Sequence, residues 1–191
     1  NALSKGTTPR KKDVDGLLGE ISFLKVKDIN DDGSINYSGI EKIPKIVHQN
    51  QLKRSILKAN DILFSIAGTI GRVSMVPEQL QNSNCNQALA FIRLANKELL
   101  PHVYYWLKSA NTQREIHSSI VQGVQANVSL TVLKSLLLVV PDSNSHIEFN
   151  KEIEPLFHMV IANREENQNL TQLRDTLLPK LISGEVRVKD A

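Results

Sequence analysis

The sequence contains little cysteine, few aromatic residues and no long apolar run. Its one cysteine, Cys85, excludes an internal disulfide and is typical of a reducing compartment, so we expect a cytoplasmic protein. Aromatic residues make up 5% of the 191 positions, too few for the broad base-stacking platforms that bind single strands. No stretch approaches the ~18 consecutive apolar residues that a transmembrane helix needs, so we expect no membrane contact.

The first residues, "NALSKGTTPRKK", lack the apolar segment of a secretory signal peptide. Position 1 is not methionine, which fits a fragment of a longer protein.

Motifs for catalysis or metal binding are also missing. There is no H-E-x-x-H or G-x-S-x-G motif, and Asp61 and Glu78 are isolated carboxylates. Nothing suggests a site for S-adenosylmethionine or ATP, so we expect no cofactor, no metal and no catalytic activity. The five histidines are scattered and have no cysteine partner with metal-ligand spacing: His48, His102, His117, His146 and His158.

The positive charge is unevenly distributed along the chain. Residues 1–145 contain 17 Lys and Arg against 12 Asp and Glu, whereas residues 146–191 contain 6 against 8. The first part could therefore meet a polyanion, although charge alone also fits a mildly basic soluble protein.

Residues 1–145 alternate between strand-like and helix-like patterns, which predicts a compact domain of the α+β (mixed α/β) class. We expect helix in part of 43–61, across 99–120 and briefly after Ser129, which would cap it. Strands are expected at 20–29, 61–67, 73–77, 87–95 and 136–140, the last being "LLLVV" before Pro141.

From His146 the pattern changes to that of one long helix. Residues 146–178 contain no glycine, and Ser145 and Glu148 have the spacing of a capping box. Pro155 predicts either a kink or a later helix start near Ile153. Apolar positions recur every three or four residues, as in a coiled coil, and we expect this seam to contact a partner helix: Ile153, Leu156, Val160, Asn163, Asn167, Leu170, Leu173 and Leu177.

Asn163 and Asn167 stand where a coiled coil usually has leucine or isoleucine. A buried asparagine there could fix the register of the helix pair at a cost in stability. The alternative is a partly buried seam in which both side chains meet water.

The stretch "LFSIAGTIGRV" (63–73) resembles a phosphate-binding loop at first sight. A Walker loop needs a lysine after its last glycine and a helix behind it, and a dinucleotide loop needs G-x-G-x-x-G before a helix. Here Gly68 and Gly71 are followed by a strand-like pattern. A tight turn between two strands is therefore the better interpretation, and a nucleotide-using enzyme is disfavoured.

The order of several motifs resembles that of the specificity subunit of type I restriction–modification systems. "GTTP" (6–9), "GTIG" (68–71) and "NQA" (86–88) look like landmarks of its target recognition domains. "LRDTLLPKLISGEVRV" (173–188) looks like the conserved end of the family's second half. The sequence departs from the family pattern before the long helix, where it has "PDSNSHIEF".

This resemblance implies a non-catalytic protein that guides modification and restriction subunits. A full subunit has two target recognition domains, each followed by a long helix, and the two helices pack antiparallel as a spacer. Each domain reads half of a bipartite DNA target. Residues 1–145 would be one such domain, and residues 146–191 the spacer or dimerisation helix with its tail.

The partners implied are double-stranded DNA, methyltransferase (modification) subunits and a second conserved helix. The chain would be either the C-terminal half of a subunit, with that helix in cis, or a natural half-length subunit that forms a homodimer. A coiled-coil adaptor without specific DNA binding is the alternative function.

DNA reading requires cations for phosphates, and hydroxyl, amide or guanidinium groups for base edges. Asparagine-rich and glutamine-rich loops are also ordinary surface connectors. We therefore predict DNA contact for the residues below as a set, not for any one of them alone. The expected phosphate contacts are Lys5, Arg10, Lys11 and Lys12, and the expected loop contacts are Thr7, Thr8, Thr69, Arg72, Asn84, Asn86, Gln87, Gln122 and Gln125.

Overall fold

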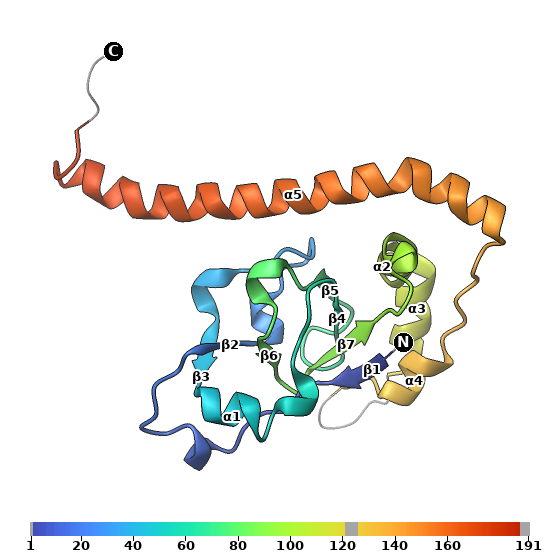
Figure 1. Ribbon diagram of the computed structural model, residues 1–191, viewed down its shortest axis with the longest axis horizontal. Helices are drawn as coiled ribbons and strands as arrows, with labels where there is room; N and C mark the ends of the chain where they lie inside the picture. The colour runs from blue at the N-terminus through green and yellow to red at the C-terminus, as the bar shows by residue number, and fades with distance from the viewer. Residues whose placement is uncertain (1, 121–125, 188–191) are drawn as a thin grey trace. The chain divides into compact units, whose positions relative to one another are not determined.

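The computed structural model describes residues 2–120 and 126–187, which belong to two compact units. Unit one is Asn1–Val140 and unit two is Pro141–Ala191. Unit one contains two sheets (Figure 1). Sheet A has the strand order β1 (Ala2–Lys5), β7 (Leu89–Arg93), β4 (Ile62–Ser65) and β5 (Val73–Met75), and sheet B has the order β3 (Glu41–Ile43), β2 (Ile21–Leu24) and β6 (Asn84–Cys85).

Short helices connect and cover the strands of unit one. The helices are α1 (Lys45–Gln49), α2 (Leu100–Lys108), α3 (Ala110–Ser118) and α4 (Leu130–Ser135). Single 3₁₀ turns lie at Lys11–Asp13, Val26–Asp28, Tyr37–Gly39, Lys53–Ser55, Glu78–Leu80 and Lys97–Leu99. Strands and helices are thus mixed along the chain, which confirms the expected α+β class.

Strand β4 lies inside sheet A, between β7 and β5, and all four of its residues are buried. This position explains why Ile62, Leu63 and Phe64 are all apolar instead of alternating with polar residues, while the buried hydroxyl of Ser65 is hydrogen-bonded. Apolar side chains from both sheets, including Leu24, Leu63 and Leu89, form the main core. A smaller cluster contains Phe23, Ile43, Val47 and Leu52.

Three expected elements of unit one differ in the structure. The strand expected at 20–29 ends at Leu24, and Val26–Asp28 forms a 3₁₀ turn. The helix expected across 99–120 is divided at Ser109, whose extended backbone ends α2 and whose side chain accepts a hydrogen bond from the Thr112 amide to begin α3. The strand expected at 136–140 is wrong, because this segment connects α4 to the long helix without joining either sheet. Leu137 is 85% exposed there and Val139 80%.

Unit two contains one long helix, α5 (Ser143–Ile182). The expected long helix is confirmed, but it begins earlier and ends later than 146–178. Asp142 caps it by accepting hydrogen bonds from the Asn144 and Ser145 amides, so the expected start at Ser145 is wrong. The helix also continues through Pro155, which excludes a start near Ile153. Within the described ranges, no helix is both long enough and apolar enough to span a membrane.

Candidate nucleic-acid interface

The pairing of sheet A brings three separate loops to one end of the sheet. Lys5, at the end of β1, pairs with Ala90, near the start of β7. Ser65, at the end of β4, pairs with Leu89. Because β1 and β4 both run antiparallel to β7, the loops after β1 and β4 and the loop before β7 emerge together.

Hydrogen bonds join the "GTTP" loop to the "NQA" loop. The Gly6 amide donates to the Leu89 carbonyl (2.9 Å), the Thr7 amide donates to the Cys85 carbonyl (3.1 Å), and the Thr8 hydroxyl donates to the Gln87 side chain. A Cβ atom on Gly6 would lie 2.1 Å from the Cys85 carbonyl oxygen. Only glycine permits this approach, which explains the glycine of the motif.

A fourth segment joins the same end. The Ile66 amide donates to the Ala88 carbonyl, the Val128 amide donates to the Ile66 carbonyl (both 2.8 Å), and Ala67 bridges to Asn127. We call this region the four-loop end, and it consists of residues 6–9, 66–72, 86–88 and 126–128.

The glycine turn at this end connects two antiparallel strands, β4 and β5, as expected. Gly68 (φ +74°) and Gly71 (φ +96°) supply the left-handed backbone that other residues rarely adopt. The Ser65 hydroxyl stabilises the turn by donating to the Thr69 carbonyl (2.6 Å) and accepting from the Arg72 amide (2.8 Å). The turn is therefore part of a hairpin, and no helix follows it to bind phosphate.

Eleven of the thirteen predicted contact residues fall into three groups. Thr7, Thr8, Thr69 and Gln87 are exposed at the four-loop end, where Lys5 also lies exposed and Asn86 is half-buried. Arg10, Lys11 and Lys12 are exposed but form a separate 3₁₀ segment, in which Arg10 pairs with Asp13 at 2.8 Å. The neighbouring Val14 packs against the smaller core cluster beside sheet B. Gln122 and Gln125 lie outside the described residues.

Asn84 does not face outwards as expected. Its side chain is fully buried, and its Oδ1 atom lies 2.6 Å from Nδ1 of His48. Its Nδ2 group donates to the Leu52 carbonyl at 3.1 Å and to the Ser55 hydroxyl at 3.4 Å. Because the amide is satisfied inside the protein, we remove Asn84 from the proposed DNA contacts.

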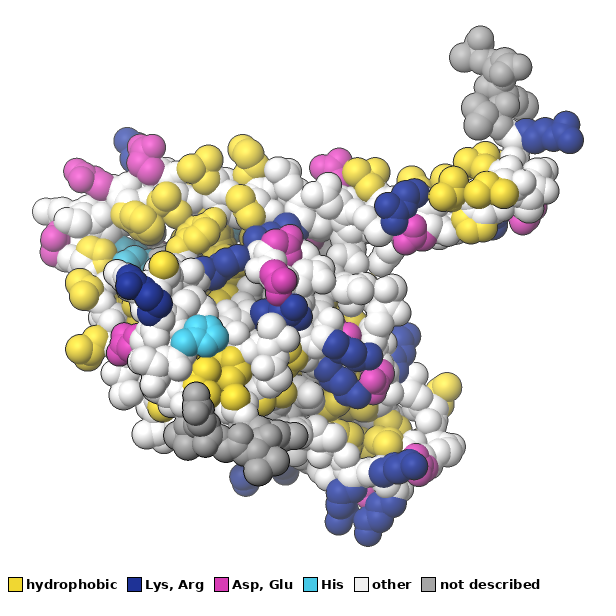
Figure 2. Space-filling model, turned by 180° about the vertical axis from the view of Figure 1, so that it is seen from behind, with side chains coloured by type: hydrophobic (Ala, Val, Ile, Leu, Met, Phe, Trp, Pro, Cys, Tyr) yellow, Lys and Arg dark blue, Asp and Glu magenta, His cyan; other side chains and the backbone are white. Residues whose placement is uncertain are grey.

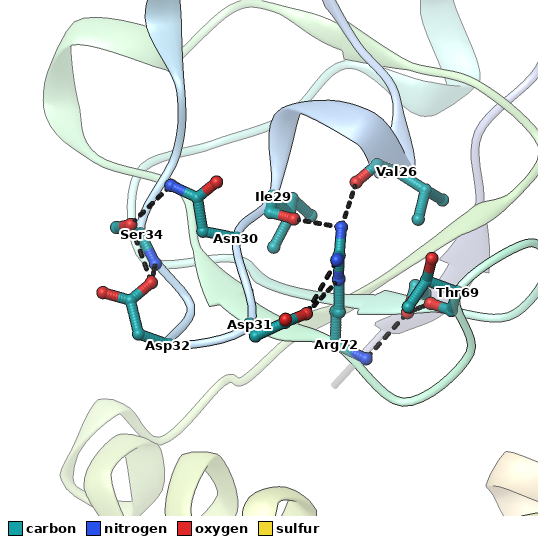
Figure 3. Close-up of polar contacts among 9 residues, drawn as sticks. Val26, Ile29, Asn30, Asp31, Asp32, Ser34, Thr69 and Arg72 are labelled. Atoms are coloured by element: carbon teal, nitrogen blue, oxygen red, sulfur yellow. Dashed lines mark hydrogen bonds and ion pairs between the residues drawn. The ribbon is translucent and has the colours of Figure 1, made fainter.

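Arg72 is also engaged inside unit one rather than free (Figure 3). Its Nε and Nη2 groups both contact Oδ1 of Asp31, at 2.8 and 2.7 Å. Its Nη1 group donates to the Ile29 carbonyl at 2.7 Å. The Arg72 side chain is 22% exposed, whereas that of Asp31 is 86% exposed.

Some residues of this region were not predicted. Gln113 of α3 donates to the carbonyls of Gly71 (3.0 Å) and Leu107 (2.7 Å), which ties the glycine turn to the helices. Lys25 and Lys27, in the segment after β2, pair with Glu41 at 2.6 and 3.4 Å. The local sequence does not indicate that Gln113 contacts Gly71 or that Lys25 contacts Glu41, because these partners are 42 and 16 residues away.

On the face drawn in Figure 2, the charged side chains are largely mixed in sign. The hydrogen bond from Lys25 holds the pKa of Glu41 below its ordinary value. Figure 2 shows Lys and Arg side chains in separate groups with Asp and Glu beside them. On the face that Figure 2 shows, the positive charge therefore forms local groups of cations rather than one uniform basic surface.

Comparison with known proteins identifies the family. Residues 2–173 match the family described as the type I restriction modification DNA specificity domain. The chain belongs to this family. The resemblance noted in the sequence is thus confirmed, and the family is one of specificity components rather than catalytic ones.

Two curated members of the family show how much of a subunit the chain covers. It is 29% identical to the specificity subunit of the type I restriction enzyme EcoBI from Escherichia coli, over 90% of this chain and 37% of that protein. It is 24% identical to the HindI specificity subunit from Haemophilus influenzae, over 95% of this chain and 39% of that protein. The chain therefore spans about two fifths of these relatives.

Solved specificity subunits share the fold. The S subunit of a type I restriction–modification system from M. genitalium matches with a TM-score of 0.57 at 18% identity, over 95% of this chain and 43% of the other. The HsdS subunit from Thermoanaerobacter tengcongensis matches with a TM-score of 0.52 at 16% identity, over 82% and 40%. At these identities the likeness concerns the fold alone.

Proposed function

We propose that this chain reads one half of a bipartite target in double-stranded DNA. The single observation that carries the proposal is the convergence of four loops, distant in sequence, at one end of sheet A. The exposed side chains there include three threonine hydroxyls and the amides of Gln87 and Asn127, which are groups that recognise base edges. Residues 1–145 would then be the recognition domain, acting in the cytoplasm where its DNA lies.

The polar groups of the four-loop end are suitably arranged for this role. Thr7, Thr8 and Gln87 come from two loops that are hydrogen-bonded to each other, and Thr69 stands at the tip of the glycine turn. Lys5 would contact a phosphate beside them, and Lys11 and Lys12 would contact phosphates further along the duplex. Loops held on a rigid sheet are a common way to position binding residues.

We further propose that residues 146–191 serve as the spacer and dimerisation element. The apolar seam of α5 is exposed: Leu156 by 55%, Leu170 and Leu173 by 54% each. Figure 2 shows hydrophobic side chains gathered near the C-terminal end of this helix. A second long helix, in cis or from a homodimer partner, would cover this seam by packing antiparallel.

The seam asparagines bear on this pairing. Asn163 and Asn167 are both exposed in the chain alone. Their burial in the paired state would fix the register, and the assembled helices would then hold methyltransferase subunits at the DNA target.

The decisive experiment is a selection from a random duplex library at fixed salt, with the chain alone and with the modification subunit. We expect enrichment of one short half-site. Gln87→Ala should relax the preference at one base position by about tenfold, since a good amide-to-base contact discriminates by roughly 1–3 kcal/mol. Discrimination would be measured by competition between matched and mismatched duplexes.

Gln81→Ala provides the matched control. Gln81 is an exposed amide six residues earlier, which lines a pocket with Asp61 and Arg93 at the opposite end of sheet A. It should leave the preference unchanged. An unenriched pool, with or without the modification subunit, would contradict the proposal and favour the coiled-coil adaptor, for which the exposed leucines of α5 are the supporting observation.

A further inference from the structure

The guanidinium group of Arg72 contacts backbone carbonyls on one side and the carboxylate of Asp31 on the other (Figure 3). Its Nη1 group donates to the carbonyls of Ile29 (2.7 Å) and Val26 (3.5 Å). Its Nε and Nη2 groups, which form the edge that binds two acceptors at once, both contact a single oxygen of Asp31. Arg72 directly follows the glycine turn and is one of the residues of the four-loop end.

We propose that Asp31 occupies the edge of Arg72 that DNA takes when it binds, so that DNA must displace Asp31 to make this contact. The inference rests on the proposed function and adds a named residue pair to it. The group that replaces Asp31 presents two acceptors, either the O6 and N7 atoms of a guanine or two oxygens of a phosphate, because both match the arginine fork.

The exposure of the two partners supports displacement. Asp31 is 86% exposed and Arg72 only 22%, so a carboxylate that is mostly in solvent contacts a guanidinium group that is mostly covered. An ion pair with one partner so exposed is weak and readily exchanged. A phosphate oxygen competes well for the same donors, since charge-assisted bidentate bonds to arginine are among the stronger ones.

The surroundings keep Arg72 in place after Asp31 leaves. The Ile29 carbonyl still accepts from Nη1, and the Arg72 amide still donates to the Ser65 hydroxyl. The turn that bears Asp31 is held independently, because the Gly33 amide donates to the Asn30 carbonyl at 3.0 Å. A side-chain rotation of Asp31 therefore suffices to open the edge.

Asp32 offers a charge-matched control on the same turn. Its Oδ1 atom accepts hydrogen bonds from the amide and the hydroxyl of Ser34, at 2.8 and 2.7 Å (Figure 3). Asp31→Asn and Asp32→Asn each remove one negative charge near the proposed DNA. Only Asp31→Asn weakens the ion pair with Arg72.

The test measures affinity of the full chain for the selected duplex by fluorescence anisotropy, with the modification subunit present if the selection required it. We expect Asp31→Asn to bind about fivefold more tightly, the upper range for release of an exposed ion pair, and Asp32→Asn to change affinity less than about twofold. In an Arg72→Lys background, which keeps the charge but not the fork, the gain from Asp31→Asn should disappear. Thermal unfolding checks that each variant is folded.

The outcomes separate this inference from the proposed function. Equal gains for Asp31→Asn and Asp32→Asn, or a gain that persists with Arg72→Lys, would overturn the inference while DNA reading stands. Failure of the unmodified chain to enrich any duplex would overturn both. If the inference holds, a gain restricted to the selected duplex assigns the contact to a guanine, and an equal gain on random duplexes with a steeper salt dependence assigns it to a phosphate.

Discussion

Asp61 connects two parts of unit one through a buried carboxylate. It is 1% exposed, and its two oxygens accept from Nε and Nη2 of Arg93 at 2.7 and 2.6 Å. It also accepts from the Lys58 amide at 2.8 Å. We expect Asp61→Asn to lower the free energy of unfolding by about 3 kcal/mol, because it leaves Arg93 without its counter-charge. Urea unfolding followed by circular dichroism would measure this.

The control for this prediction is Asp13→Asn. Asp13 pairs with Arg10, whose side chain is 66% exposed. An ion pair of this kind contributes at most about 1 kcal/mol. A loss for Asp61→Asn no greater than that for Asp13→Asn would show that the buried pair does not stabilise the fold.

The buried thiol of Cys85 should make the folded chain less stable at alkaline pH. Burial, aided by the charge of Asp61, raises the pKa of its thiol from an ordinary 9.0 to about 12. Between these values the unfolded chain loses the thiol proton and the folded chain keeps it, so the unfolded state gains stability as pH rises. The free energy of unfolding should therefore be about 1.4 kcal/mol lower at pH 10 than at pH 8.

Cys85→Ala separates this effect from those of other titrating groups. The variant will be less stable at every pH, but urea unfolding should show a smaller loss between pH 8 and pH 10 than in the unmodified chain. Equal losses in the two proteins would refute the assignment to Cys85.

Single residues also show where prediction from the sequence ended. Asn84 and Gln87 stand in the same polar run, yet one is buried and the other exposed. Their difference depends on His48 and Thr8, which are 36 and 79 residues away. Arg72 likewise finds Asp31 at a separation of 41 residues. Residue type could be read from the sequence, but partners so distant could not.

At the scale of elements, helix α5 carries a prediction about association. Leu170, Leu173 and Leu177 are 54%, 54% and 37% exposed, so their replacement should hardly change the stability of the chain alone. Replacing all three with glutamine should weaken pairing with a second helix by at least about a hundredfold, since burial of each leucine contributes roughly 1.5–3 kcal/mol. Analytical ultracentrifugation of the chain would measure the association.

Gln172→Ala is the control for these leucines. Gln172 is exposed, and helical spacing places it on the opposite side of α5 from the seam. It should leave association unchanged. If the leucine variant associates as well as the unmodified chain, the seam is not the contact surface.

The elements that were predicted well had strong local signals. The buried strand β4 and the long helix α5 each have a pattern that is complete within a few turns or residues. The segment 136–140 has a strand-like composition, but a strand also needs a neighbour for its backbone hydrogen bonds. Its exposed position between α4 and α5 provides none, and composition could not reveal this.

At the scale of the whole molecule, four loops from separate parts of unit one meet at one end of sheet A, and the hydrogen-bonded strands of that sheet hold them there. The family could be predicted from the order of its motifs along the chain. The fold class and the long helix could be predicted from local patterns of apolar residues. The meeting of the loops follows from strand order, which the sequence does not display.

The position of β1 has a consequence for how the chain folds. Its neighbour within sheet A is β7, and Leu3 pairs with Ile92. During synthesis β1 therefore cannot pair until β7, which lies near the middle of the given sequence, has been made. The β4–β5 hairpin can form earlier from local contacts, and closure by β1 would then be a late step that completes the surface to which Thr7 and Thr8 belong.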